Sequence, residues 1–391
     1  MTFEEIKQTA DAYLMPTYAH FPIALARGKN ATYWDAEGRE YIDFTAGIGV
    51  NSLGTNDEAW KNAVKAQLDC LQHTSNLYYN ETVAKAAQML CERAGFARVH
   101  LSNSGAEANE CAIKLARKYS FDKYGDGRYN IISLVNSFHG RTIATVTATG
   151  QAHYHEFFTP FLDGFKYAES GDREGFLQLL DGTDCAVMLE VIQGEGGVLE
   201  TPQEYIEFVR RICDEKDILL IFDEVQTGVG RTGKLFAYET VGVKPDILTT
   251  AKGIGGGLPM GACLCTEALG NTLTAGTHGT TFGGNPVACA GSLAVLERMD
   301  DAFLQSVREK GDYIREKLKS FTEIQEIRGR GLMIGIDLKT KKAGEVAAKC
   351  CENGLLILTA KSALRMLPPL TITYEEIDKG LSVLERVLSE S

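Results

Sequence analysis

The stretch Ile218-Leu-Leu-Ile-Phe-Asp-Glu-Val-Gln226 places five consecutive apolar residues before two acids. It shows no alternation of polar and apolar residues, and such a run is typical of a strand buried on both faces of a parallel sheet. Further apolar runs occupy residues 130–135 and 185–192. This βαβα order predicts an α/β fold with right-handed crossovers, because helical spacing of apolar residues alternates with the runs, in the ranges 81–95, 104–119 and 205–216.

The two ends of the chain have a different pattern. Aromatic and β-branched residues flank the turn signal Asp35-Ala-Glu-Gly38, which predicts a hairpin over residues 31–44. After about residue 300 a small α+β domain is indicated, with strands in 326–338 and 355–368 and helices over 344–352 and 374–388.

Domain boundaries follow from these changes of pattern. An N-terminal segment of about 45 residues makes a marginal core by itself, so we expect it to pack with the small domain. The expected division is residues 1–45 as this N-terminal segment, 46–295 as a large ligand-binding domain and 296–391 as the C-terminal small domain.

Composition limits the classes of partner. The chain has 391 residues, 44% of them hydrophobic and 24% charged, which is typical of a globular protein. Its formal net charge of -12 argues against binding to nucleic acid or an anionic membrane, because both need a positive field. We find no apolar run near the roughly 18 residues of a membrane span, and the start lacks the basic-then-apolar order of a signal peptide. We therefore expect a cytoplasmic protein that binds small molecules in a local pocket.

Ten cysteines are scattered along the chain, and none has the C-x-x-C spacing of a structural zinc site. They make up far less of the sequence than in a disulfide scaffold. We expect reduced, mostly buried thiols, as in a cytosolic protein, and no metal site.

Polar residues that directly follow apolar runs are candidates for a ligand site, because open α/β sheets bind ligands beyond the carboxyl ends of their strands. Asp223 ends the run that begins at Ile218, and a half-buried carboxylate there needs a cation to stay ionised. Lys252 follows the run 247–251, where burial would lower its pKa and make its amine nucleophilic. The glycines after Lys252 would let a ligand approach closely. By itself the acid is equally well a cap, and the lysine a strand-end residue that snorkels to solvent.

A third strand end is Leu101-Ser-Asn-Ser-Gly-Ala-Glu-Ala-Asn109, in which small residues open a helix. Unpaired N–H groups and the helix dipole make such a start an anion site, although an ordinary N-terminal cap has the same sequence signature. A lysine, an acid and a phosphate cup are together what pyridoxal 5'-phosphate requires. The lysine forms a Schiff base with its aldehyde, the acid keeps its ring nitrogen protonated, and the helix start holds its phosphate. We therefore expect this cofactor.

In their order along the chain, the motifs resemble those of the class III aminotransferases, which are fold-type I pyridoxal-phosphate enzymes. Each motif alone is weak, but their order, with 29 positions from Asp223 to Lys252, is specific. The resemblance implies a large domain with a mostly parallel seven-stranded sheet flanked by helices, plus a small α+β domain. It runs from about Pro22 to the C-terminus and rests on Asp35-Ala-Glu-Gly-Arg-Glu-Tyr-Ile-Asp-Phe44, Gly47-Ile-Gly-Val-Asn51, Ser102-Asn-Ser-Gly-Ala-Glu-Ala-Asn109, Ser137-Phe-His-Gly-Arg141, Gln193-Gly-Glu-Gly-Gly197, Phe222-Asp-Glu-Val-Gln-Thr-Gly-Val-Gly-Arg-Thr-Gly233, Ala251-Lys-Gly253 and His278-Gly-Thr-Thr-Phe-Gly-Gly-Asn-Pro286.

The resemblance also implies roles for single residues. Lys252 would hold the cofactor covalently and move the proton between substrate and cofactor carbons, and Asp223 would hold the ring nitrogen. His139 looks like a general base, but beside Lys252 a packing or positioning role is the better interpretation. Two subunits of a homodimer would complete each active site. The other cofactor contacts would be Gly105 and Ala106 at the phosphate, joined across the dimer by Thr281, Phe138 and Val225 on the two ring faces, and Gln226 near the ring hydroxyl.

For the substrates, the resemblance implies amino-group exchange between N-acetylornithine and 2-oxoglutarate, which becomes glutamate. This exchange would place the protein in arginine synthesis. Arg141 would bind the α-carboxylate of the ω-amino donor, with Thr280 of the other subunit beside it. Arg365 would bind the α-carboxylate of glutamate, and Glu195 would act as its gate. One site must accept an amine at the δ carbon and then at the α carbon, so a movable Glu–Arg pair offers the second carboxylate a bidentate partner only when needed.

Several alternatives stay open at this point. Ornithine, succinylornithine and 4-aminobutyrate aminotransferases would suit the same motifs, and an aminomutase or decarboxylase would use the same cofactor. A Rossmann oxidoreductase is disfavoured, because Gly253-Ile-Gly-Gly-Gly257 is only part of the dinucleotide motif and 258–265 reads as a proline break and a strand. Two departures from the family pattern, Thr55-Asn-Asp57 and Val191, affect local loop shape rather than the residues of the reaction.

Overall fold

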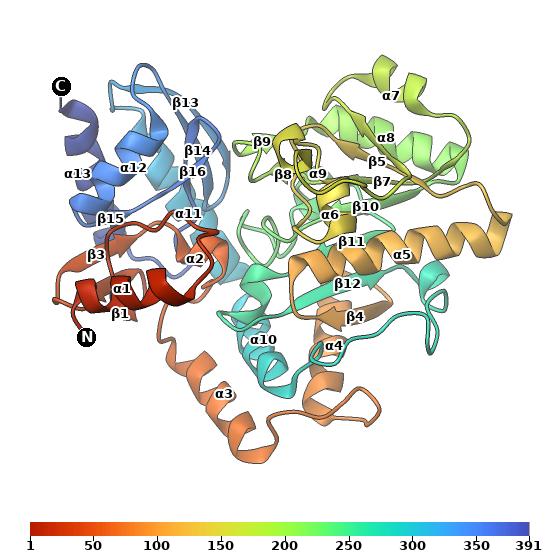
Figure 1. Ribbon diagram of the computed structural model, residues 1–391, viewed down its shortest axis with the longest axis horizontal. Coiled ribbons are helices and arrows are strands. Elements are labelled where there is room, and N and C mark those ends of the chain that lie inside the picture. The colour runs from red at the N-terminus through yellow and green to blue at the C-terminus, as the bar shows by residue number, and fades with distance from the viewer. Residues whose placement is uncertain (391) are drawn as a thin grey trace.

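A seven-stranded sheet lies at the centre of the larger part of the molecule, on the right of Figure 1. The computed structural model describes residues 1–390. The strand order is β4-β12-β11-β10-β7-β5-β6, and neighbours are parallel except where β12 is involved, which confirms the mostly parallel sheet. The strands are β4 (Arg98–Ser102), β5 (Asn130–Leu134), β6 (Phe165–Ala168), β7 (Asp184–Leu189), β10 (Leu219–Asp223), β11 (Ile247–Thr250) and β12 (Gly261–Cys265).

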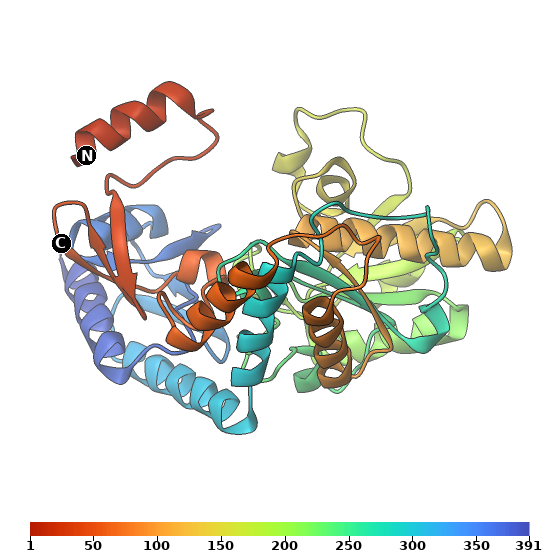
Figure 2. The ribbon, with the colours of Figure 1, turned by 90° about the horizontal axis from the view of Figure 1, so that it is seen from below.

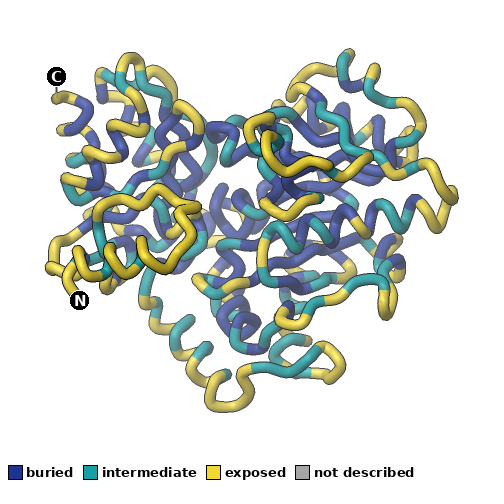
Figure 3. The backbone as a smooth tube through the Cα atoms, viewed as in Figure 1, coloured by how far each residue is buried: buried dark blue, intermediate teal, exposed yellow. Residues whose placement is uncertain are grey.

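Helices cover both faces of this sheet, which is why its central strands lack alternation. Ile221 and Met188 belong to the core cluster that contains the residues of α5 (Gly105–Tyr124). Leu220 and Val187, one position along, belong instead to the cluster that contains α8 (Gln203–Lys216). Successive strand residues therefore pack on opposite helices, and both kinds must be apolar. The central strands β7, β10, β11 and β12 are buried throughout and belong to the dark blue part of Figure 3.

Two four-stranded sheets form the other part of the molecule, on the left of Figure 1. One has the order β1-β2-β3-β15, and in it Leu355 of β15 pairs in parallel with Ile42 of β3. The N-terminal hairpin thus shares a sheet with the C-terminal region. The boundaries at 45/46 and 295/296 remain a prediction. The strands are β1 (Leu25–Lys29), β2 (Thr32–Asp35), β3 (Glu40–Asp43), β13 (Ile324–Arg330), β14 (Met333–Leu338), β15 (Leu355–Leu356), β16 (Leu358–Ala360) and β17 (Ala363–Met366).

The first helix, α1 (Phe3–Tyr13), lies apart from the body in Figure 2, and none of its residues is buried. A capping box between Thr2 and Glu5 stabilises its start. A two-stranded sheet joins β8 (Ile192–Gln193) and β9 (Leu199–Glu200). The remaining helices and 3₁₀ turns are α2 (Ala46–Gly49), α3 (Glu58–Cys70), α4 (Glu81–Ala94), α6 (Ile143–Ala148), η1 (Ala152–His155), α7 (Arg173–Leu179), α9 (Tyr238–Val241), η2 (Lys252–Gly255), η3 (Glu267–Leu269), α10 (Pro286–Arg298), α11 (Asp301–Leu318), α12 (Ala343–Glu352) and α13 (Tyr374–Ser389).

Several predicted elements have different bounds in the structure. The region 326–338 forms two antiparallel strands, β13 and β14, and the first of them begins at Ile324. The helix predicted to end at residue 119 continues to Tyr124, because Gly125 with a φ of 75° stops it. The apolar run 185–192 is two strands, since β7 ends at Leu189 and β8 belongs to another sheet. The region 355–368 contains three short strands rather than one. Within residues 1–390, no helix combines the length and the apolarity that a membrane crossing needs.

Candidate active site

Three strands of the large sheet end at one cavity. β4, β10 and β11 point in the same direction, because β12 is antiparallel to both β4 and β11 and β10 is parallel to β11. A cavity of about 590 Å³ opens beyond their carboxyl ends. Its lining includes most of the predicted site residues, namely Gly105, Ala106, Phe138, Arg141, Glu195, Asp223, Val225, Gln226 and Lys252. Residues up to 147 positions apart in sequence, from Gly105 to Lys252, thus meet where the topology predicts.

Asp223 is held rigidly at the floor of this cavity, with only 3% of its surface exposed. Its Oδ2 accepts a hydrogen bond from Nδ2 of Asn109 at 2.7 Å and lies 2.7 Å from Nδ1 of His139. Its Oδ1 accepts from the backbone N–H of Val225 at 3.0 Å. Thr249 orients Asn109 in turn by donating to its Oδ1 at 2.6 Å. His139 therefore positions the carboxylate of Asp223, a contact that the sequence alone did not predict.

Lys252 directly follows β11 and begins the 3₁₀ turn η2. Its side chain faces the cavity, and burial lowers the pKa of its amine, against the opposing effects of the Glu195 and Asp223 carboxylates. The glycines after it serve packing more than ligand access. A Cβ on Gly253 would lie 2.5 Å from the Ser52 hydroxyl, and only Gly257 of this run lines the cavity.

The start of α5 forms a cradle with little side-chain bulk. Ser104 caps the helix by accepting from the N–H of Glu107 at 3.2 Å. The N–H groups of Gly105 and Ala106 precede the first intrahelical hydrogen bond, so they are free to bind an anion. A Cβ on Gly105 would lie 2.7 Å from Cγ1 of Val225, which shows that only glycine fits between helix and β10 loop.

An ion pair between the buried Arg365 and the half-buried Glu195 lies at one side of the cavity. Nη1 of Arg365, which is 3% exposed, donates to Oε1 of Glu195 at 2.6 Å. Gln226 joins them, since its Oε1 accepts from Arg365 at 3.1 Å and its Nε2 donates to Glu195 at 3.3 Å. Burial alone would raise the pKa of Glu195, but the Arg365 charge holds it below its ordinary value. The structure therefore places Gln226 in the Glu195–Arg365 network, and its contact with a ring hydroxyl remains a prediction.

Arg141 is exposed at the cavity and lies on two aromatic rings. Its guanidinium carbon is 4.2 Å from the ring centre of Tyr154 and 5.5 Å from that of Phe138. Stacking fixes the plane of the guanidinium while its N–H groups stay free for a carboxylate. Thr280 and Thr281 lie outside the cavity of their own chain. Thr280 accepts from Nδ2 of Asn103 at 3.2 Å, and Thr281 is exposed.

Sequence reasoning missed Glu190, a buried acid in the cavity wall. It accepts from the N–H groups of Phe138 at 2.9 Å and Gly194 at 3.1 Å, and burial raises its pKa to about 7. The signal that singled out Asp223 also applies here, because Glu190 directly follows the apolar strand β7. Asn109 and Tyr154 carry no such signal, since their roles depend on contacts between distant segments.

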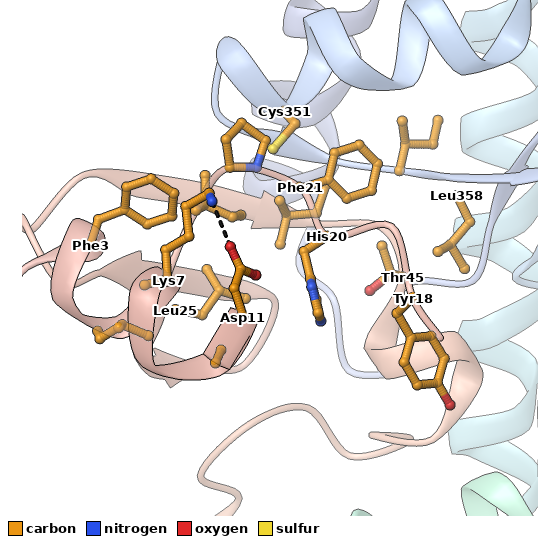
Figure 4. Close-up of a pocket in the computed structure, with 17 residues that line it drawn as sticks. Phe3, Lys7, Asp11, Tyr18, His20, Phe21, Leu25, Thr45, Cys351 and Leu358 are labelled. Carbon is orange, nitrogen blue, oxygen red and sulfur yellow. Dashed lines mark hydrogen bonds and ion pairs between the residues drawn. The ribbon is translucent and has the colours of Figure 1, made fainter. Parts of the chain in front are cut away.

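A second cavity, of about 570 Å³, lies beneath α1 and is drawn in Figure 4. Lys7 and Asp11 form an exposed ion pair at 2.6 Å on its rim, and apolar side chains such as Phe21, Leu25 and Leu358 make up much of its lining. It contains no pairing of a buried lysine with a buried acid. The chemistry therefore belongs to the cavity at the strand ends.

The residues of that cavity fit pyridoxal phosphate. Lys252 supplies an amine of lowered pKa, Asp223 a buried carboxylate, and the start of α5 free N–H groups beside a glycine that no larger residue could replace. Fold and site together define a pyridoxal-phosphate-dependent enzyme.

Comparison with known proteins gives the family. Residues 13–388 match the family described as aminotransferase class-III, and the chain belongs to that family. It is 51% identical to an acetylornithine aminotransferase of Haemophilus ducreyi over 392 residues, covering 100% of both chains. It is 43% identical to a succinylornithine transaminase of Citrobacter koseri, covering 97% of this chain and 96% of the relative. A crystal structure of the ornithine aminotransferase from Toxoplasma gondii superposes with a TM-score of 0.94 at 33% identity, over 99% of this chain and 95% of that one. The protein is a pyridoxal-phosphate-dependent aminotransferase.

Proposed function

We propose that the enzyme transfers the δ-amino group of N2-acetylornithine to 2-oxoglutarate, reversibly giving N-acetylglutamate 5-semialdehyde and glutamate. One observation carries the proposal: the cavity of Lys252 is lined by one arginine, and a second arginine of the opposite kind is bound to Glu195 in its wall. Arg141 is exposed with its N–H groups free, whereas Arg365 is buried and neutralised by Glu195. The name of the Haemophilus ducreyi relative, at 51% identity over the whole chain, supports the choice of donor.

The buried pair explains how one site handles two carboxylate positions. An ω-amino donor presents no carboxylate next to its reacting amine, so Glu195 remains on Arg365 and keeps the buried guanidinium neutralised. Glutamate presents its α-carboxylate at that position, and this group replaces Glu195 on Arg365. Arg141 at the other end binds the distant carboxylate of the ω-amino donor.

The residues around Lys252 provide for proton transfer. When bound, the cofactor withdraws electrons from the substrate carbon that loses its proton. Asp223, fixed by Asn109 and His139, would hold the proton at the ring nitrogen. Lys252 would hold the cofactor, and its amine, whose pKa burial lowers, would carry the proton once the amine is released from the cofactor. Phe138 and Val225 line the cavity, where they would enclose the ring and exclude water.

We further propose a homodimer in which Thr280 and Thr281 serve the partner's site. Asn76 ties the loop before α4 to the Thr281 loop by donating to the carbonyl of Gly283 at 2.9 Å. Large apolar side chains of both loops are exposed, with Leu77 at 87% and Phe282 at 62%. Such a cluster is typical of an interface. A cytoplasmic location is supported by the ten cysteines, which are all unpaired.

A donor screen tests the substrate. Protein loaded with cofactor is mixed with one amino donor at a time, and the visible absorption band of the cofactor is followed. N-acetylornithine and glutamate should each bleach the band. Bleaching by 4-aminobutyrate but not by N-acetylornithine would overturn the proposal. The variant Arg365→Gln should slow the reaction with glutamate far more than the reaction with N-acetylornithine.

The same screen separates the closest alternatives. An ornithine or succinylornithine enzyme would react faster with its own donor than with N-acetylornithine. An aminomutase would return a rearranged amino acid without 2-oxoglutarate. The Glu195–Arg365 pair disfavours the mutase, because a mutase has no second substrate that needs this arginine.

A further inference from the structure

Two histidines and two cysteines come together between α5 and the edge of the large sheet formed by β4 and β12. The ligand atoms of His100 on β4, Cys111 on α5 and His278 all lie within 4.8 Å of one another. The rings of His100 and His278 are 4.7 Å apart between centres. The Nε2 atom of His100 is buried and has no hydrogen-bond partner in residues 1–390.

Cys263 lies beside this group of three and shares a hydrogen bond with Cys111. It lies opposite His100 in the antiparallel pairing of β12 with β4. The hydrogen bond with Cys263 is the main reason that the pKa of Cys111 is lowered to about 5, and contacts with His278 and His100 act in the same direction. Both cysteines are unpaired and buried. Their sulfurs are therefore neighbours without a covalent bond.

We propose that His100, Cys111, His278 and Cys263 form a binding site for a thiophilic divalent cation, for which zinc is the natural candidate. Two thiolates and two imidazoles are a set that zinc prefers, and tetrahedral geometry at about 2.0–2.3 Å puts ligand atoms roughly 3.5 Å apart. The ligand atoms of His100, Cys111 and His278, all within 4.8 Å of one another, would move closer to reach that spacing, and Cys263 would join them from its hydrogen bond with Cys111. The proposal departs from our expectation of no metal, which considered only ligands close in sequence.

The site would fix the loop between η3 and α10. His278 comes from this loop, whereas the other three ligands come from β4, α5 and β12. Lys114 lies 3.0 Å from Nδ1 of His278 and donates to the carbonyl of Thr277 at 2.9 Å. Its positive charge opposes a cation, so the negative charge of the Cys111 thiolate is needed to offset it, and Cys263 would lose its proton when the metal binds. Thr280 and Thr281 follow His278, so the metal would hold the segment that, if the proposed dimer is correct, reaches the partner subunit.

Metal content tests the site. The cofactor-loaded protein is incubated with zinc, dialysed and assayed for zinc per chain, beside the variants Cys111→Ser, His100→Gln and Cys70→Ser. Cys70 is exposed and lies on another helix, so it is the matched control. We expect one zinc per chain in the wild type and in Cys70→Ser, a loss of more than tenfold in Cys111→Ser and His100→Gln, and a higher Tm with zinc but not with magnesium.

Two results would overturn the proposal. One is a zinc content that is wrong for the site. The wild type would bind less than a tenth of an ion per chain, or Cys111→Ser would bind as much zinc as the wild type. The other is a Cys111–Cys263 disulfide that forms in air and that added zinc does not prevent, found by mass spectrometry of unreduced peptides. Retained cofactor absorbance shows that each variant is folded. Because zinc content does not depend on turnover, this test and the donor screen fail independently.

Discussion

Lys252 adopts a backbone conformation that non-glycine residues rarely take, with a φ of 46°. Such a conformation costs about 1 kcal/mol or more and persists only where the surroundings enforce it. Here β11 fixes the chain before Lys252, and the packing of Gly253 against Ser52 fixes it after. The strain is thus located at the residue whose amine must point into the cavity.

Removal of the negative charge of Glu195, the proposed gate, should change the preference of the enzyme between its two amino donors. In Glu195→Gln, Arg365 loses its counter-charge and stays available for an α-carboxylate. We expect kcat/KM for glutamate to rise about tenfold relative to that for N-acetylornithine, since 1.4 kcal/mol is tenfold and a charge-assisted hydrogen bond is worth about that much. The control is Glu200→Gln, whose partner Arg330 lies at the surface. An unchanged ratio in steady-state assays would contradict the gating role.

The buried carboxyl of Asp43 should make stability depend on pH. Burial raises its pKa from 3.8 to about 6. The protonated carboxyl therefore stabilises the folded state fully below pH 3.8, and this stabilisation is lost as the pH rises through about 6, because the folded protein then has to bury a charge. Asp43→Asn keeps the Oδ1 acceptor for Thr45 and does not titrate. Urea unfolding between pH 4 and 7 should show the wild type losing about 3 kcal/mol relative to the variant. If the free energies of unfolding of the wild type and Asp43→Asn changed in parallel over this pH range, the prediction would be wrong.

At the scale of elements, the contact between α5 and the loop after β10 shapes the phosphate cradle. Gly105→Ala should push Val225 into the cavity, because the added Cβ would lie 2.7 Å from Cγ1. Overpacking of this kind costs about 1–3 kcal/mol, so we expect the Kd for pyridoxal phosphate to rise about tenfold. The double variant Gly105→Ala with Val225→Ala should recover most of the loss. Cofactor titration of the apoprotein measures both, and equal affinities of wild type and Gly105→Ala would contradict the account.

Long buried elements could be predicted from the sequence, and short ones could not. The β10 run and the helix α8 match within two residues, because continuous apolar runs and 3.6-residue spacing reflect burial directly. The strands β15 to β17 have two to four residues each, too few to show a period. Their separation depends on pairing with β3 and β14, which are more than 20 positions away.

The residues of the candidate site also fall into two groups, those that the sequence could predict and those that it could not. Asp223, Lys252 and the start of α5 follow apolar strands, so topology alone brings them together. The same rule would have found Glu190. It could not have found the support of Asp223 by Asn109 and His139, nor a cluster such as His100 with His278, whose members are 178 positions apart. These contacts depend on how side chains orient after the chain has folded.

At the scale of the whole molecule, the exposed apolar loops around Phe282 should form the dimer interface. Phe282→Glu places a charge among large apolar side chains, which should weaken association and lower activity at low protein concentration. Leu177→Glu is the control, because Leu177 is exposed on α7, which lies well away from α10 in Figure 1. Sedimentation should show Phe282→Glu shifting toward monomer. A stable dimer in that variant would contradict the proposed interface.

The central claim is that the amine of Lys252 holds pyridoxal phosphate in the cavity where β4, β10 and β11 end. Borohydride reduction of the loaded protein, followed by digestion and mass spectrometry, measures this directly. We predict the phosphopyridoxyl group on the peptide that contains Lys252, and none after Lys252→Ala. The group on another lysine, or a protein that takes up no cofactor, would contradict it.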